Sequence, residues 1–150
     1  MRNFGNLGEF AAAVGEELGT SEWLTITQAR VDQFAEATDD HQWIHTDRER
    51  SAEGPFGTTV AHGYLTLSLI PRFESEIFTV EGLSMALNYG SESVRFPSPV
   101  PVGSRVRAIA SLEHVEWGQH GLRATVKFVV EREGEEKPVC VARTLSVLAE

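Results

Sequence analysis

The chain has 150 residues, of which 41% are hydrophobic, and a formal net charge of -9. This length and apolar content predict one globular domain over residues 1–150 with a core of its own. The negative charge argues against nucleic acid and against an anionic membrane surface as partners, because both bind basic faces.

Helical spacing of apolar residues runs through the first part of the chain. It predicts a first helix, ended by Gly19, whose apolar positions are Leu7, Phe10, Ala11, Val14 and Leu18. A second helix is predicted to start at Thr27 as N-cap, with Ile26 and Val31 packed against each other across its start. The sequence Thr38-Asp39-Asp40 ends this helical pattern.

Two further segments precede the second half. A short helix is expected after Asp47, because Thr46 and Glu49 have the spacing of a capping box. The composition of residues 54–57, Gly-Pro-Phe-Gly, predicts a loop. From His62 to about Pro71 almost every residue is apolar or small, so we expect a helix buried nearly all round.

The second half alternates apolar and polar residues with the period of β-strands. The alternating sets are Met85, Leu87 and Tyr89; Val106, Ala108, Ala110 and Leu112; Leu122, Ala124, Val126, Phe128 and Val130; and Val139, Val141, Leu145 and Val147. Turn residues separate the sets at 97–103, 118–121 and 133–136. The expected fold class is therefore α+β, with one curved antiparallel sheet wrapped around one buried helix.

The stretch Asp40-His41-Gln42-Trp43-Ile44-His45 carries the clearest chemical signal. It places a carboxylate and an imidazole five residues apart, and His62-Gly63 follows at the start of the apolar helix. A carboxylate and an imidazole can share a water molecule and move its proton. The free N–H groups of a helix start can stabilise a negatively charged oxygen. Together these features indicate addition of water next to a polarised carbonyl.

These residues also carry a family resemblance. The segment from Phe34 to Asp47, then Thr59–Leu65, then Asn88-Tyr89-Gly90 resembles the MaoC-like (R)-specific enoyl-CoA hydratases. That resemblance implies a single hotdog fold, in which a sheet wraps a central helix. The family usually has Asn and Pro where Gln42 and Trp43 stand, a departure that resembles a nodulation-protein-N-like subgroup.

The resemblance also implies the function and the site. We expect hydration of a trans-2-enoyl thioester, or the reverse dehydration, with Asp40 and His45 as the catalytic pair. Gly63, His62 and Asn88 are the expected oxyanion or substrate-binding residues. No cofactor and no metal are expected. The expected partners are an acyl thioester of coenzyme A or of acyl carrier protein and a second copy of the chain, since family members with one such unit form dimers joined edge to edge.

Several alternatives stay open from the residues alone. Asp40 could end a helix, and His62 could be only the first residue of the buried helix. Apolar candidates for an acyl tunnel are Phe56, Tyr64, Leu65 and Trp43, and basic candidates for the phosphates of coenzyme A are Arg95, Arg105, Arg107, Arg123 and Lys127. A hotdog thioesterase would need an acid on the central helix, and Tyr64–Ile70 has none. A non-catalytic acyl-binding or assembly subunit is the third alternative.

The remaining expectations concern the cysteine and the compartment. Cys140 is the single cysteine, so no internal disulfide can form, and its predicted place is in the core. The N-terminus lacks the apolar run of a signal peptide, and no stretch reaches the roughly 18 apolar residues of a membrane span. We therefore expect a cytoplasmic protein.

Overall fold

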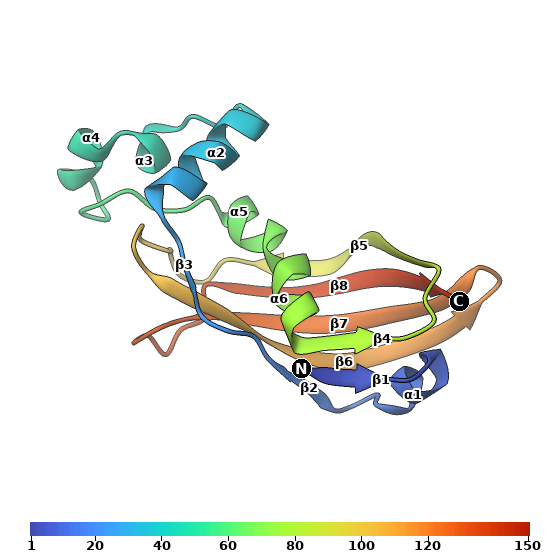
Figure 1. Ribbon diagram of the computed structural model, residues 1–150. Helices are drawn as coiled ribbons and strands as arrows, with labels where there is room; N and C mark the ends of the chain where they lie inside the picture. The colour runs from blue at the N-terminus through green and yellow to red at the C-terminus, as the bar shows by residue number, and fades with distance from the viewer.

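The computed structural model describes all 150 residues and contains one curved antiparallel sheet with helices on one side and at one end (Figure 1). Its strands are β2 (Glu17–Thr20), β3 (Leu24–Thr25), β5 (Met85–Arg95), β6 (Arg105–Gly118), β7 (Gly121–Arg132) and β8 (Cys140–Ala149). The spatial order is β2-β6-β7-β8-β5, and β3 also pairs with β6. The expected α+β class and the antiparallel sheet are confirmed, and β5 forms one edge of the sheet.

The helix against the sheet is longer than the sequence predicted. It consists of α5 (Gly63–Ser68) and α6 (Ile70–Ile77), which meet at Leu69. The expected end near Pro71 is wrong, because proline is tolerated in the first turn of a helix, and Pro71 lies in the first turn of α6. The helix α6 is followed directly by the strand β4 (Phe78–Val80).

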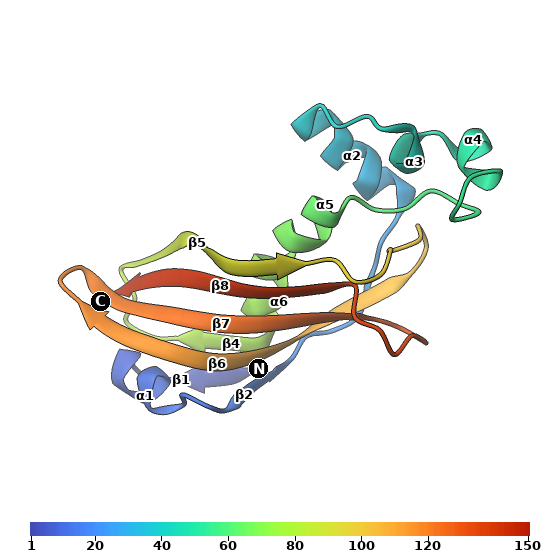
Figure 2. The ribbon, with the colours of Figure 1, turned by 180° about the vertical axis from the view of Figure 1, so that it is seen from behind.

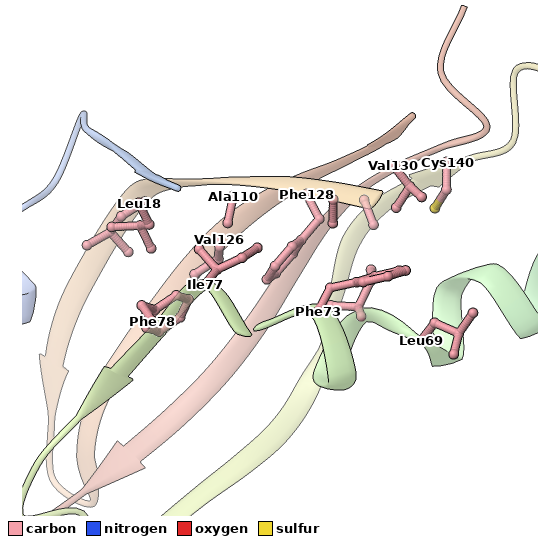
Figure 3. Packing of buried hydrophobic residues seen from close by; sticks show 14 of the residues in the cluster. Leu18, Leu69, Phe73, Ile77, Phe78, Ala110, Val126, Phe128, Val130 and Cys140 are labelled. Atoms are coloured by element: carbon pink, nitrogen blue, oxygen red, sulfur yellow. The ribbon is translucent and has the colours of Figure 1, made fainter. Parts of the chain in front are cut away.

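The core lies between this helix and the inner face of the sheet. Figure 3 shows Phe73 and Ile77 beside Phe128, with Leu69 farther along the helix. Phe73 and Phe128 have no exposed surface. Burying such a side chain stabilises the fold by about 1.5–3 kcal/mol, so this interface holds the central helix in place.

Two strands, β8 and β5, do not bury the face that carries their large apolar residues. In β8 the buried side chains are Cys140, Ala142 and Leu148, whereas the larger Val141, Leu145 and Val147 lie on the other face and are half-buried. The register pairs Val130 with Cys140 and Phe128 with Ala142, which puts the small residues under the helix. The prediction that Cys140 is a core residue is confirmed.

The edge strand β5 likewise carries its large apolar residues on the outer face. Three large apolar residues of β5, namely Met85, Leu87 and Tyr89, are 45%, 51% and 64% exposed. Leu87 pairs with Val147 and therefore lies on the outer face of the sheet. The alternation correctly predicted the strand but not which face it buries.

The predicted first helix is also shorter than expected. The helix α1 covers only Leu7–Ala12, and Leu18 is buried in strand β2. Gly15 adopts φ 88° and donates its N–H to the carbonyl of Leu112, which turns the chain into the sheet. Before α1, the strand β1 (Arg2–Phe4) pairs in parallel with β4, a contact that no local pattern predicted.

Three helices stand beyond one end of the strands, as both ribbon views show (Figure 1, Figure 2). They are α2 (Gln28–Thr38), α3 (Trp43–Thr46) and α4 (Arg48–Ala52). The predicted N-cap of α2 is confirmed, since the Thr27 side chain accepts from the N–H of Arg30. The cap of α4 is Asp47, not Thr46, because the Asp47 carboxylate accepts from the N–H of Arg50. None of the helices is long and apolar enough to cross a membrane.

Candidate active site

The end of α2 brings Asp40 and His45 to the same place. Asp39 caps α2 in the left-handed conformation, with φ 58°, a shape that Asp tolerates better than most residues. This turn reverses the chain, and α3 then presents His45 one short helix later. The side chain of Asp40 is 47% exposed, whereas His45 is buried. The pair therefore combines a solvated carboxylate with a desolvated imidazole.

The imidazole of His45 is held by a backbone carbonyl. Its Nδ1 lies 2.6 Å from the carbonyl oxygen of Val60. Because a carbonyl only accepts, Nδ1 carries the proton, and Nε2 of the neutral ring is left as an acceptor. Burial lowers the pKa of His45, and the Val60 contact only partly offsets this effect. His45 is therefore neutral at pH 7 and can accept a proton through Nε2.

His62 lies behind this pair. Its Nε2 donates to the backbone carbonyl of Asp40 over 3.0 Å, and the same nitrogen is 4.0 Å from the Asp40 carboxylate. Its ring stacks on that of His45 with centroids 3.8 Å apart and an interplanar angle of 24°. His62 is only 2% exposed. Its contacts hold the backbone of Asp40 and the ring of His45 side by side.

One ligand atom from each of Asp40, His45 and His62 lies within 4.8 Å of the other two, and these residues are the one group of three possible metal-ligating side chains. A tetrahedral ion at about 2.1 Å from each ligand needs donor atoms about 3.4 Å apart. The Asp40 carboxylate and Nε2 of His62 are 4.0 Å apart, and one nitrogen of each imidazole already contacts a backbone carbonyl. This spacing suits a hydrogen-bonded water better than a directly bound ion.

Gly63 opens the helix α5 directly after His62 and lines a hollow of about 280 Å³. The hollow is formed by Phe56, Ala61, Gly63, Thr66, Phe96, Pro97, Ser98, Pro99, Val100 and Val139. A Cβ atom added at Gly63 would lie 2.9 Å from the ring of Phe96. The first N–H groups of a helix have no partner within the helix, so the backbone of Gly63 offers a donor at a place where no side chain fits.

The other candidate residues are placed as follows. Asn88 is exposed on β5 opposite Ser146, and it belongs neither to the cluster nor to the hollow. Trp43 does not line the hollow but packs over Gly54, with the guanidinium of Arg50 4.2 Å from its ring centroid. Of the proposed tunnel residues, Phe56 lines the hollow and Leu65 lies in the core.

Tyr64 is 70% exposed and packs its ring edge-on against Phe96, so it lies at the margin of the hollow. His41, His114 and His120 are exposed.

Three of the five basic candidates are already paired with carboxylates. Arg105, Arg107 and Arg123 form ion pairs with Glu133, Glu131 and Glu116, respectively. Arg95 and Lys127 have no such partner. Arg95 and Lys127 are therefore the two of the five basic candidates whose charge is not paired with a carboxylate.

Sequence reasoning missed two parts of the site. The carbonyl of Val60 holds His45, but a backbone acceptor leaves no mark in the sequence. Gln28 is buried and donates to the carbonyl of His45 over 2.7 Å. At the first position of a helix a glutamine normally faces solvent, so only the fold reveals this contact.

Comparisons with known proteins agree with this geometry. The sequence profile described as MaoC like domain matches residues 9–141. The chain is 56% identical over 146 residues to 3-hydroxyacyl-thioester dehydratase Z of Mycobacterium tuberculosis (strain ATCC 25618 / H37Rv), with 97% of each chain covered. It is 43% identical over 146 residues to nodulation protein N of Rhizobium leguminosarum bv. viciae, covering 95% of this chain and 91% of that protein.

A solved structure shares the fold. The (R)-hydratase from A. caviae involved in PHA biosynthesis superposes with a TM-score of 0.74 at 22% identity, covering 90% of this chain and 96% of the other. At this identity the likeness concerns the fold.

Proposed function

The chain belongs to the MaoC-like dehydratase family of hotdog proteins, and from this we propose that it adds water to a trans-2-enoyl thioester, or removes it from the 3-hydroxyacyl thioester, with (R) stereochemistry. One observation carries the proposal: Asp40, His45 and His62 each bring one side-chain nitrogen or oxygen within 4.8 Å of the other two. Next to them, Gly63 begins a helix at an apolar hollow.

The proposed chemistry starts with one water molecule held between Asp40 and His45. Nε2 of His45 is a free acceptor, and burial keeps the ring neutral by lowering its pKa. As the water oxygen attacks C3 of the enoyl group, the pair takes up one of its protons, and C2 receives a proton from the same pair. The two groups form one coupled acid–base unit, so neither owns a given proton throughout.

The charge that develops on the thioester oxygen needs a donor. We assign this role to the backbone N–H of Gly63, which lies at the start of α5. One donor of this kind contributes about 10²–10³ in rate. We assign to His62 a supporting role, since its Nε2 donates to the carbonyl of Asp40 and its ring stacks on His45.

The proposed substrate is an acyl thioester of coenzyme A or of acyl carrier protein. The hollow beside Gly63 is mainly apolar in its lining, with Phe56, Phe96 and Val100 among its residues, and this suits an acyl or pantetheine chain. Arg95 and Lys127 remain as candidates for the phosphate groups, because their charges are not paired.

The thioesterase alternative is weaker. The central helix does carry acids beyond the predicted segment, since α6 extends to Ile77 and includes the half-buried Glu74 and Glu76, of which Glu74 is the nearer to Gly63 along the chain. Eleven residues separate Glu74 from Gly63, and a helix rises about 16 Å over that length. A carboxylate so far from the proposed oxyanion donor cannot direct water to the same carbonyl carbon.

We also propose that two copies associate through β5. This strand is the edge of the sheet, and its outer side exposes Met85, Leu87 and Tyr89. Edge strands with free backbone groups favour pairing, and Asn88 would then lie at a subunit contact. The single cysteine is buried and has no partner for a disulfide, which is compatible with the cytoplasmic setting that we propose.

A spectrophotometric assay with crotonyl-CoA tests the function. Loss of the conjugated enone absorbance reports hydration, and release of free thiol reports thioester hydrolysis. We expect Asp40→Asn and His45→Gln each to lower kcat by about 10²–10⁴, with thermal unfolding near that of the unmodified protein. The control is His114→Gln, which removes an exposed histidine. Near-normal hydration by either site variant would refute the catalytic pair.

A further inference from the structure

Gln28 connects the two segments that form the site. Its side-chain NH2 donates to the backbone carbonyl of His45 over 2.7 Å and to the carboxylate of Asp32 over 2.8 Å. Its side-chain oxygen accepts from the hydroxyl of Thr59 over 2.6 Å. Gln28 and Thr59 are 6% and 2% exposed. A buried amide with three short hydrogen bonds has one orientation only.

These bonds lie beside the contact that holds the catalytic imidazole. Thr59 precedes Val60, whose carbonyl accepts from Nδ1 of His45. The N–H of Val60 in turn donates to the carbonyl of Ile44 over 2.9 Å. Gln28 therefore links the backbone of His45 to the side chain of Thr59, the residue directly before Val60.

We propose that Gln28 and Thr59 are positioning residues for the hydration reaction, because together they fix the Val60 carbonyl against Nδ1 of His45 and so keep Nε2 free to accept a proton. This inference rests on the proposed function for its kinetic consequence, but the position of the ring can be measured without activity. Neither residue touches the reacting atoms.

The physical reason is the orientation of one ring. An imidazole has two nitrogens, and the hydrogen bond at one of them determines which of the two can act as base. If Val60 moves, Nδ1 loses its acceptor, and the ring can turn or change tautomer. Displacements of about 1 Å in a reacting group can cost as much as 10²-fold in rate.

The test uses the isosteric substitution Thr59→Val, which removes the hydroxyl, and the conservative Thr59→Ser, which keeps it. With crotonyl-CoA we expect Thr59→Val to lower kcat about tenfold with KM changed less than twofold, and Thr59→Ser to restore most of the loss. Gln28→Met should behave like Thr59→Val. The double variant should lose no more than the worse single variant, because both changes break one network.

A second readout follows the ring itself. In the protein with ¹⁵N-labelled histidine, the proton on Nδ1 of His45 should give a downfield resonance, because it is buried in a 2.6 Å contact. His45→Gln assigns the resonance by removing it. We expect Thr59→Val and Gln28→Met to weaken or shift this signal, and Thr59→Ser to retain it.

Ser21→Ala is the matched control, since it removes another buried hydroxyl, one that accepts from the N–H of Ala108 outside the site. An unchanged kcat and resonance in Thr59→Val would overturn the inference, and so would an equal loss of kcat in Ser21→Ala. If Thr59→Val does not fold, Gln28→Met decides by the same two readouts. If the unmodified protein hydrates no enoyl thioester, the proposed function fails, while the resonance still tests how His45 is held.

Discussion

Adding one methyl group at Gly63 should impair catalysis through a single contact. In Gly63→Ala the new Cβ would lie 2.9 Å from one carbon of the Phe96 ring and 3.0 Å from two others. Ordinary contacts of a Cβ begin at 3.4 Å. Either the ring or the start of α5 must therefore move by about 0.5 Å, the difference between these distances.

The size of the effect follows from where that movement goes. The ring of Phe96 is 42% exposed and packs edge-on against Tyr64, with 6.4 Å between the ring centroids, so it can yield only partly. If the helix start takes up the shift, a hydrogen bond of about 2.9 Å to the thioester oxygen lengthens to about 3.4 Å and loses most of its strength. We expect kcat to fall by about 10–100-fold, with a loss of stability of about 1–3 kcal/mol from overpacking.

The assay is steady-state hydration of crotonyl-CoA together with thermal unfolding. The informative partner is the double variant Gly63→Ala/Phe96→Ala, measured against Phe96→Ala alone. Removing the ring removes the clash, so the methyl group should then lower kcat only a few-fold. Full activity in Gly63→Ala, or an equal loss with and without the ring, would refute this account of why a glycine stands at the helix start.

Three further predictions concern pH, a half-buried acid and the sheet edge. Burial lowers the pKa of His45 in the folded protein, so kcat/KM should be level above about pH 6.5 and fall as the pH drops through the lowered pKa and the base becomes protonated. The unfolded chain binds this proton more tightly than the folded protein, so stability should also be lost as the pH falls from about 6.5 through the lowered pKa; a kcat/KM that stays level at acid pH would contradict this. Burial raises the pKa of Glu74, so the stability that comes from its protonated state is lost as the pH rises above 4.5. Glu74→Gln should therefore raise the free energy of unfolding at pH 7 by up to about 1 kcal/mol, and by less at pH 4, as measured by denaturant unfolding. Leu87→Lys on the outer side of β5 should convert the proposed dimer to monomer in light scattering, whereas Val14→Lys, at an exposed apolar site off β5, should not.

Local sequence determined much of the framework. Thr27 caps α2 because a threonine oxygen can accept from an N–H three residues on, and residues 38–40 end it because Asp tolerates the left-handed turn that Asp39 adopts. The four long strands β5 to β8 followed from alternation, and the pair Asp40 and His45 from motif spacing. Each of these features depends on residues close together in the chain, so a single segment carries the information.

The tertiary structure decided what depends on distant partners. Leu18 fits a helical pattern, but pairing of β2 with β6 made it a strand residue. The register of β8 with β7 placed Cys140 and Ala142 opposite Val130 and Phe128 in the core, a choice of face that the apolar residues of β8 did not predict. The carbonyl of Val60 meets His45 across fifteen residues, and Gln28 meets Thr59 across thirty-one. Such contacts form only when segments far apart in the sequence pack together. A backbone carbonyl or a single amide side chain has no sequence pattern from which its partner can be predicted.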